Sequence, residues 1–344
     1  MNKVTIVVPT YNVEAYIAKC LKSLVNQTAD SYDVLVINDG SPANEQVIID
    51  EYVKNYPFVH SIIKENGGYG SVIAEALRSI ETPYLLICDP DDYLYPHTIQ
   101  TLIDLMEAKQ ADLVIGAKTL VYADNSEEVY DKSYNDIGDT LIDKHIYLRN
   151  TKEYDQLFFI EPSPHAKLYK TEYLKKIKFP NKVSYTDNIL FFISLIQTNK
   201  VVYTSEPLAY YLINRVGNTR TDVKLQVINS WITVFTSILR QSNDYRDIPG
   251  IFYYRMFEGY KHIINDKIDN VIANDEEFKL KLAELYQIIE LLLPHKKEIM
   301  EYYSQYADYR IVERVKDHLL FTPFSSKFIF QRLTKRKEDL RKLK

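Results

Sequence analysis

Three acidic residues, Asp89, Asp91 and Asp92, lie close together in the chain. They follow the apolar run Tyr84–Cys88, which predicts a buried strand. Open α/β sheets bind their ligands at the carboxyl ends of strands. Carboxylates this close repel one another unless a cation lies among them, and carboxylate oxygens usually hold a hard divalent cation. The alternative is an acidic turn, because Asp-Pro favours turns and acids often cap the next helix.

Polar residues also follow three earlier predicted strands. The strands are expected at Val4–Val8, Val34–Ile37 and Val59–Ile63, and the segments after them are Pro9-Thr10-Tyr11-Asn12, Asn38-Asp39-Gly40-Ser41 and Asn66-Gly67-Gly68. Apolar residues at helical spacing between the strands indicate βαβ units, whose parallel strands end at one edge of the sheet. Each segment alone suits an ordinary turn. Together with the acidic cluster they predict one ligand site.

Composition bounds the class of protein. The chain has 344 residues and a formal net charge of −5, which fits a soluble globular protein and argues against broad nucleic-acid binding. Cys20 and Cys88 fall in apolar contexts, where we expect small core residues without a disulfide. The N-terminus has no signal-peptide pattern, and no apolar run approaches the roughly 18–20 residues that cross a bilayer. A cytoplasmic protein is the simplest expectation.

The pattern along the chain divides it into parts. Residues 1–117 alternate strands and helices, whereas 118–160 fit loops, short antiparallel strands or short helices. A second ordered block begins near residue 164, and almost everything beyond residue 223 is predicted helical. We therefore expect a first domain at 1–220, with halves 1–117 and 118–220. A helical C-terminal region is expected at 221–344.

The motifs at the strand ends resemble those of the family 2 glycosyltransferases. The segments that carry the resemblance are Thr5–Asn12, Cys20–Thr28, Asn38–Ser41, Glu65–Gly68 and Asp89–Asp92, and then Lys167–Lys170, Tyr185–Asn188 and Tyr210–Tyr211. It covers roughly residues 3–116 and returns in 164–219. It implies the GT-A fold, a Rossmann-like and mostly parallel α/β sheet with flanking helices. It also implies inverting transfer of a sugar from a nucleotide-diphosphate donor.

The resemblance assigns roles to individual residues. Those expected to bind the nucleotide sugar are Pro9, Thr10, Tyr11, Asp39, Asn66, Gly67 and Asp89. Arg215, which follows the Tyr210–Tyr211 strand, is expected either to join them from a loop that closes on the donor or to be a solvated loop cation. Asp91 is the first choice for a Mn²⁺ or Mg²⁺ ligand, together with Asp89. His165 is either a third ligand or a structural hydrogen-bonding residue. Such a cation would stabilise the charge on the departing diphosphate.

Two carboxylates are expected to act in catalysis. Asp187 matches the family's catalytic base, which removes a proton from the acceptor hydroxyl. Asp92 would position the acceptor or support the metal. For each of them, capping of the following helix is the alternative.

The chain departs from the family pattern at two positions. Thr186 stands where the family has Glu, and Ile73 stands where it often has a basic Arg. The positive charge near the diphosphate would then come from the metal, from helix N-terminal amides or from another cation. The candidate cations are Lys167, Arg215 and Arg220.

The basic C-terminal stretch, residues 327–344, contains eight Lys or Arg and two acids. It would lie on an anionic membrane surface, or form an exposed terminal helix or a homo-oligomer contact. The expected localisation is then cytoplasmic, either free or peripheral to the inner face of the membrane.

The expected reaction transfers a sugar, most simply from a UDP-sugar, to a hydroxyl of a glycan, glycoprotein or lipid-linked acceptor. The resemblance places it in bacterial surface polysaccharide biosynthesis. One alternative is a degenerate transferase that acts as a binding or scaffold subunit, because two family residues are replaced. Another is a sugar nucleotidyltransferase, but Pro9-Thr10-Tyr11-Asn12 occupies the place where that class needs a glycine-rich basic loop.

Overall fold

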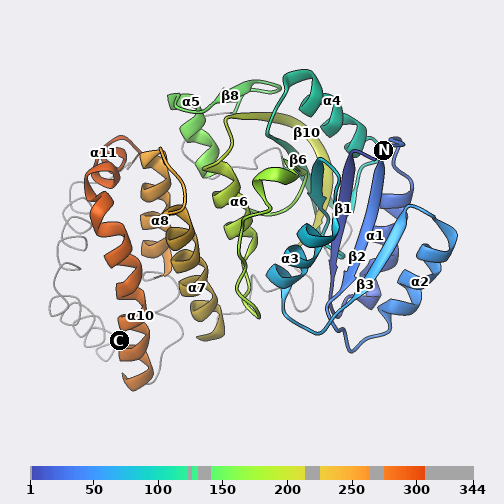
Figure 1. Ribbon diagram of the computed structural model, residues 1–344, viewed down its shortest axis with the longest axis horizontal. Coiled ribbons are helices and arrows are strands. Elements are labelled where there is room, and N and C mark those ends of the chain that lie inside the picture. Colours follow the sequence, from blue (N-terminus) through green and yellow to red (C-terminus); the bar gives the residue numbers. More distant parts are fainter. Residues whose placement is uncertain (1, 123–125, 131–140, 214–224, 264–274, 307–344) are drawn as a thin grey trace. The chain divides into compact units, whose positions relative to one another are not determined.

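The computed structural model describes residues 2–122, 126–130, 141–213, 225–263 and 275–306 (Figure 1). The chain divides into two compact units, Met1–Asp222 and Val223–Lys344. The first unit holds a ten-stranded sheet with helices around it. The described elements of the second unit are helical. The predicted α/β class followed by a helical region is therefore confirmed.

Four parallel strands form one half of the sheet. They are β1 (Val4–Thr10), β2 (Tyr32–Asn38), β3 (Val59–Ile63) and β4 (Tyr84–Ile87). Their order is β3-β2-β1-β4, and each neighbouring pair is parallel. Every residue of β1 is buried, as its continuous β-branched sequence predicts for a strand covered on both faces. The four polar segments that follow these strands consequently share one edge of the sheet.

Helices follow these strands, as the apolar spacing predicts. They are α1 (Glu14–Val25), α2 (Glu45–Asn55), α3 (Tyr69–Ser79) and α4 (Thr98–Lys109). The buried face of α1 contains Ile17, Leu21 and Leu24 at helical spacing. Cys20 lies on the same face, and its sulfur is 3.8 Å from that of Cys88. Both cysteines are buried and free, which confirms the prediction of small core residues.

The other half of the sheet mixes strand directions. It contains β5 (Tyr93–Leu94), β6 (Leu113–Val121), β7 (Glu127–Tyr130), β8 (Ile146–Leu148), β9 (Lys167–Lys170) and β10 (Lys200–Leu212). Strand β9 lies between β4 and β6 and is antiparallel to both. The start of β9 therefore lies beside the carboxyl end of β4. This reversal brings the residues before β9 to the same edge as the acidic cluster.

Short helices connect the strands of this half. They are α5 (Lys152–Asp155) and α6 (Asp187–Leu195), with 3₁₀ turns at Gln156–Phe159 and Thr171–Tyr173. Helix α6 is buried along almost its whole length, and its sequence is apolar on all sides. Such a helix has little freedom to move, so the residue that begins it, Asp187, is held firmly.

The second unit contains α7 (Leu225–Ser242), α8 (Gly250–His262), α10 (Asp275–Leu292) and α11 (Lys296–Tyr306). Helix α7 packs against α10, and α8 packs against α11. A side chain at Gly259 of α8 would meet the ring of Phe235, so a glycine is needed there. In the described part of the chain, no helix has the length and apolar character needed to span a membrane. The basic stretch 327–344 lies outside the described residues.

Candidate active site

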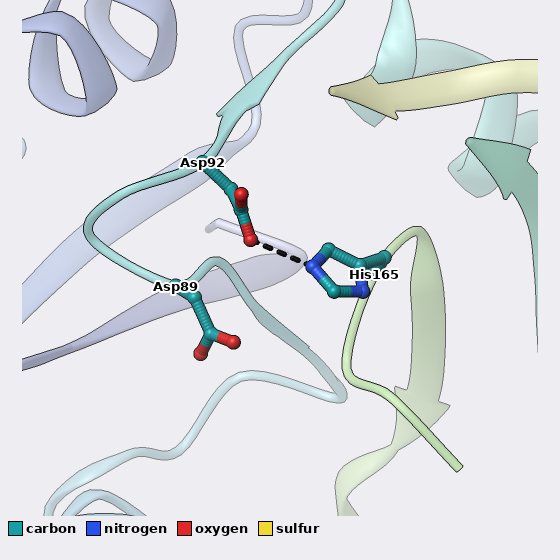
Figure 2. A group of neighbouring side chains, drawn as sticks. All are labelled: Asp89, Asp92 and His165. Carbon is teal, nitrogen blue, oxygen red and sulfur yellow. Dashed lines mark hydrogen bonds and ion pairs between the residues drawn. The ribbon is translucent and has the colours of Figure 1, made fainter. Parts of the chain in front are cut away.

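The turn that follows β4 brings two of its carboxylates together with a histidine. Ligand atoms of Asp89, Asp92 and His165 lie within 4.8 Å of one another (Figure 2). Asp89 and Asp92 come from the turn, and His165 comes from the segment just before β9. This group differs from the ligand pair predicted from the sequence, because it contains Asp92 and His165 and does not include Asp91.

His165 is suited to bind a metal ion in its neutral form. Burial and the nearby charges of Lys118 and Lys167 hold the pKa of His165 well below its usual value of 6.5. Its Nε2 lies 2.6 Å from Oδ2 of Asp92, which fits a neutral imidazole that donates to the carboxylate. Its Nδ1 is buried and has no hydrogen-bond partner among the described residues. A neutral imidazole is the form of histidine that binds metals, and Nε2 is the ring nitrogen that is directed at the carboxylates (Figure 2).

Asp89 lies where a nearby cation would relieve an unfavourable charge. Burial, followed by the charges of Asp92 and Asp91, raises the pKa of Asp89 well above its usual value. The hydroxyl of Tyr69 donates a hydrogen bond to Oδ1 of Asp89 at 3.1 Å, which only partly offsets this effect. Two carboxylates and a neutral imidazole form a donor set that Mn²⁺ accepts, and Mg²⁺ accepts its oxygen part. The residues present therefore fit the divalent cation expected from the sequence.

Asp92 also fixes the end of β10. Its Oδ1 accepts a hydrogen bond from the backbone N–H of Leu212 at 2.8 Å, while Oδ2 faces His165. The side chain is only 2% exposed. The alternative of helix capping is wrong, because Asp92 precedes β5 and the next helix begins later, at Thr98. Asp92 thus ties the acidic turn to the strand that ends just before residues 214–224.

Asp39 organises a loop at the neighbouring strand end. Its Oδ1 accepts from the backbone N–H of Gly67 at 3.0 Å, and its Oδ2 accepts from that of Gly68 at 2.7 Å. Lys64 Nζ lies 2.6 Å from the same Oδ1 and also donates to Ser71 Oγ. We call residues Asn66–Gly70 the glycine loop. Asp39 and Lys64 together hold it against the end of β2.

The remaining residues of the predicted nucleotide site lie along this edge. Pro9 and Thr10 end β1 and are buried, and the carbonyl of Thr10 accepts the backbone N–H of Asp39. Tyr11 follows and is 49% exposed, which leaves part of its ring accessible to a ligand. Asn66 is exposed. Arg215 and Arg220 lie outside the described residues.

Asp187 begins α6 and has an unusual proton affinity. Burial raises its pKa to about 6, against hydrogen bonds from the side chain and backbone of Asn188. The capping alternative is not observed, because Thr186 occupies the N-cap position and makes no side-chain capping bond. Asp187 also acts electrostatically on Asp89 and is among the causes that raise its pKa. A carboxylate with a pKa near neutrality, close to the acidic turn, is suited to accept a proton.

Two buried lysines, Lys118 and Lys167, and the partly exposed Glu161 form a charged group that affects Asp187. Lys118 Nζ is 2.6 Å from Oε2 of Glu161. Lys167 donates to the carbonyl of Ser163 and lies 5.5 Å from the ring centre of Phe191 in α6. Burial lowers the pKa of Lys167 to about 7. Glu161 and Lys167 act on Asp187 with opposite signs, raising and lowering its pKa respectively.

Several residues of this site were not identified from the sequence. Lys64 and Tyr69 flank the Asn66-Gly67-Gly68 motif, and this position was the only signal for them. Lys118 interrupts an apolar strand, which is itself a sign of a paired buried charge. Ile73, in the place of the family arginine, is a buried core residue. Lys64 places a positive charge beside the glycine loop.

Several curated relatives of the chain are named glycosyltransferases. It is 28% identical to glycosyltransferase GlyA of Streptococcus pneumoniae over 230 residues, which is 64% of this chain and 32% of that protein. It is also 28% identical to a poly(ribitol-phosphate) beta-glucosyltransferase of Bacillus spizizenii, over 62% of this chain and 33% of that protein. The chain thus spans about a third of the length of these two relatives.

A solved structure and a family model agree with this similarity. S. aureus TarS 1–349 in complex with UDP-GlcNAc superposes with a TM-score of 0.74 at 19% identity, over 99% of this chain and 92% of that one. This likeness establishes the GT-A fold. The sequence model of the glycosyl transferase family 2 matches residues 5–178, which is half of the chain. The protein therefore belongs to glycosyl transferase family 2.

Proposed function

We propose that the protein is an inverting, metal-dependent glycosyltransferase that moves a sugar from a UDP-sugar to a hydroxyl group. The observation that carries the proposal is the proximity of two functions at one edge of the sheet. Asp89, Asp92 and His165 form a group with the chemistry of a metal site. Asp187, whose pKa lies near 6, acts electrostatically on the same Asp89.

The residues of the chain divide the work of such a reaction. Asp89, Asp92 and His165 would hold the cation, with Asp91 of the same turn as a further oxygen ligand. A bound Mn²⁺ or Mg²⁺ supplies charge stabilisation for the departing diphosphate. Pro9, Thr10 and the partly exposed ring of Tyr11 would line the nucleoside site. Asp39 would act there directly and through the glycine loop that it holds.

Asp187 would be the general base. Its ionised carboxylate accepts the proton of the acceptor hydroxyl, and the hydroxyl oxygen then forms the new bond to the anomeric carbon. The bond from that carbon to the diphosphate breaks on the opposite face, which inverts the configuration. A pKa near 6 leaves the group ionised at neutral pH and still able to hold a proton in the transition state.

The choice of UDP and of the acceptor class rests on the relatives. TarS binds UDP-GlcNAc, and the Bacillus relative is a poly(ribitol-phosphate) beta-glucosyltransferase. We therefore propose a UDP-sugar donor and an acceptor in bacterial surface glycan synthesis, such as a teichoic acid or a related glycan. The work would take place in the cytoplasm, where nucleotide sugars are available. Peripheral membrane contact through residues 327–344 stays a proposal, as does self-association.

Calorimetric titration tests the donor site first. UDP should bind in the presence of Mn²⁺, with weaker binding of GDP and CDP, and chelation of the metal should weaken the binding of UDP. Screening of UDP-sugars would follow, and NMR of the anomeric centre would report inversion directly. If none of the three nucleotides binds with or without Mn²⁺, the proposal is wrong. The replacement of Glu by Thr186 and of Arg by Ile73 would then favour a scaffold subunit.

A further inference from the structure

The glycine loop connects the donor side of the site to the segment that carries Asp187. On the donor side, Asp39 accepts from the backbone N–H groups of Gly67 and Gly68. The next residue, Tyr69, begins α3 and donates its hydroxyl to Oδ1 of Asp89 at 3.1 Å. One short loop therefore contacts both carboxylates expected to face the nucleotide sugar.

Tyr69 is suited to act as a permanent hydrogen-bond donor. Burial raises its pKa well above 10, and the charges of Asp89 and Asp187 raise it further. The hydroxyl is directed at Oδ1 of Asp89, and the charge of Asp187 also acts on it.

The opposite side of the loop packs on the segment 179–187 without room for side chains. The carbonyl of Gly67 accepts the backbone N–H of Lys182 at 2.6 Å. A Cβ on Gly68, whose φ is +83°, would lie 3.1 Å from the backbone of Lys182. A Cβ on Gly70 would lie 2.8 Å from Cβ of Phe179 and 3.1 Å from Oγ1 of Thr186. Glycine at position 70 thus lets α3 lie directly against the residue that precedes Asp187.

We propose that Tyr69 is a positioning residue, which fixes the Asp89 carboxylate. The close packing of Gly70 on Thr186 then fixes the position of that carboxylate relative to Asp187. The inference rests on the proposed function and concerns the same site. It also gives a reason for the replacement of the family glutamate at position 186. Thr186 is 1% exposed and lies against Gly70, where a short side chain fits.

Removal of one hydroxyl tests the first part. Tyr69→Phe keeps the ring and deletes the donor to Asp89, so Mn²⁺-dependent binding of UDP should weaken about tenfold, as expected for a lost hydrogen bond to a charged group. In turnover assays the variant should show mainly a higher KM for the donor, with a smaller loss of kcat. Tyr52→Phe is the matched control, because its hydroxyl donates to the carbonyl of Ala18 in α1.

A double-mutant cycle separates positioning from a merely structural role. If Tyr69 acts through Asp89, then Tyr69→Phe combined with Asp89→Asn should bind UDP no more weakly than Asp89→Asn alone. Independent losses would instead multiply, and that result would overturn the inference. Thermal melting of each variant with and without UDP keeps losses of folding apart from losses of binding.

The packing of Gly70 needs its own variant. In Gly70→Ala, the added methyl group should push the Thr186–Asp187 turn away from Asp89, so kcat should fall at least tenfold while UDP affinity changes less than about threefold. Unchanged kcat in this variant would contradict the claim that Gly70 sets the relative position of Asp89 and Asp187. A wild-type protein that binds no nucleotide overturns the proposed function and this inference with it. A wild-type protein that binds UDP, together with a Tyr69→Phe variant that binds it equally well, overturns the inference alone.

Discussion

Nε2 of His165 lies 2.6 Å from Oδ2 of Asp92, and this contact joins the turn after β4 to the segment that enters β9. The two residues meet because β9 runs antiparallel to β4, which brings its start to the carboxyl end of that strand. Both side chains are buried. Loss of one partner leaves a polar group without its hydrogen bond in the interior. The metal group and the local stability therefore depend on the same pair.

Replacement of His165 should affect binding and stability together. We expect His165→Ala to lower the free energy of unfolding by about 1–3 kcal/mol, because Asp92 loses a buried partner. Mn²⁺-dependent UDP affinity should fall at least tenfold. Calorimetry and denaturant melts measure the two effects. His60→Ala, at an exposed position in β3, is the control. Undiminished UDP affinity in the His165 variant would remove this residue from the metal group.

Replacement of Asp187 should separate chemistry from binding. Asp187→Asn keeps the shape of the side chain but cannot accept a proton, so kcat should fall by about 10²–10⁴. UDP affinity should stay within about twofold. Initial rates and calorimetry on the same preparation test this prediction, with Asp50→Asn on the exposed face of α2 as the control. A fully active Asp187→Asn enzyme would refute its role as the base.

The sequence was enough to predict the strand-end residues of the site but not the contact between Asp92 and His165. Pro9 lies at the end of a continuous apolar strand, and Asp39 and Asp89 each come after one, so the parallel βαβ rule was enough to bring them to one edge. No local sequence pattern predicts the hydrogen bond between Asp92 and His165. It depends on the direction and place of β9, which tertiary pairing decides.

The pKa of Asp187 makes activity and stability depend on pH in opposite ways. The base must be ionised, so kcat should fall as the pH drops through about 6. In stability, a raised pKa means that the folded protein favours the protonated acid. The ionised form therefore costs stability at pH values above about 6, and the cost fades as the pH falls toward the unfolded value of 3.8. Asp187→Asn should be more stable than wild type at pH 8, by about 1–3 kcal/mol.

Thermal melting of the wild type and of Asp187→Asn across the pH range tests this pH dependence of stability. The stability advantage of the Asp187→Asn variant should shrink steadily between pH 7 and pH 4. An advantage that stays constant over this range would show that burial of the charge is not its cause.

Lys64 pairs with Asp39 at 2.6 Å, and its removal should loosen the glycine loop. Asp39 is 2% exposed, and among the described residues its carboxylate would keep the amides of Gly67 and Gly68 as partners. We expect Lys64→Met to lower the free energy of unfolding by about 1–3 kcal/mol and to weaken UDP binding about five- to tenfold. Lys54→Met, at the exposed end of α2, is the matched control. Equal UDP affinity in both variants would mean that Asp39 holds the loop without help from Lys64.

Glu161 and Lys167 should shift the titration of Asp187 in opposite directions. Glu161 raises the pKa of Asp187, and Lys167 lowers it. Glu161→Gln should therefore move the acidic limb of the pH profile of kcat to lower pH, whereas Lys167→Met should move it to higher pH. Each change removes one charged side chain, so a general loss of packing would shift the two profiles in the same direction. Glu161→Gln also removes the charge that Lys118 pairs with at 2.6 Å, and should cost about 1–3 kcal/mol of stability. Opposite shifts would identify Asp187 as the titrating base, whereas a limb that is unmoved in both variants would assign that titration to another group.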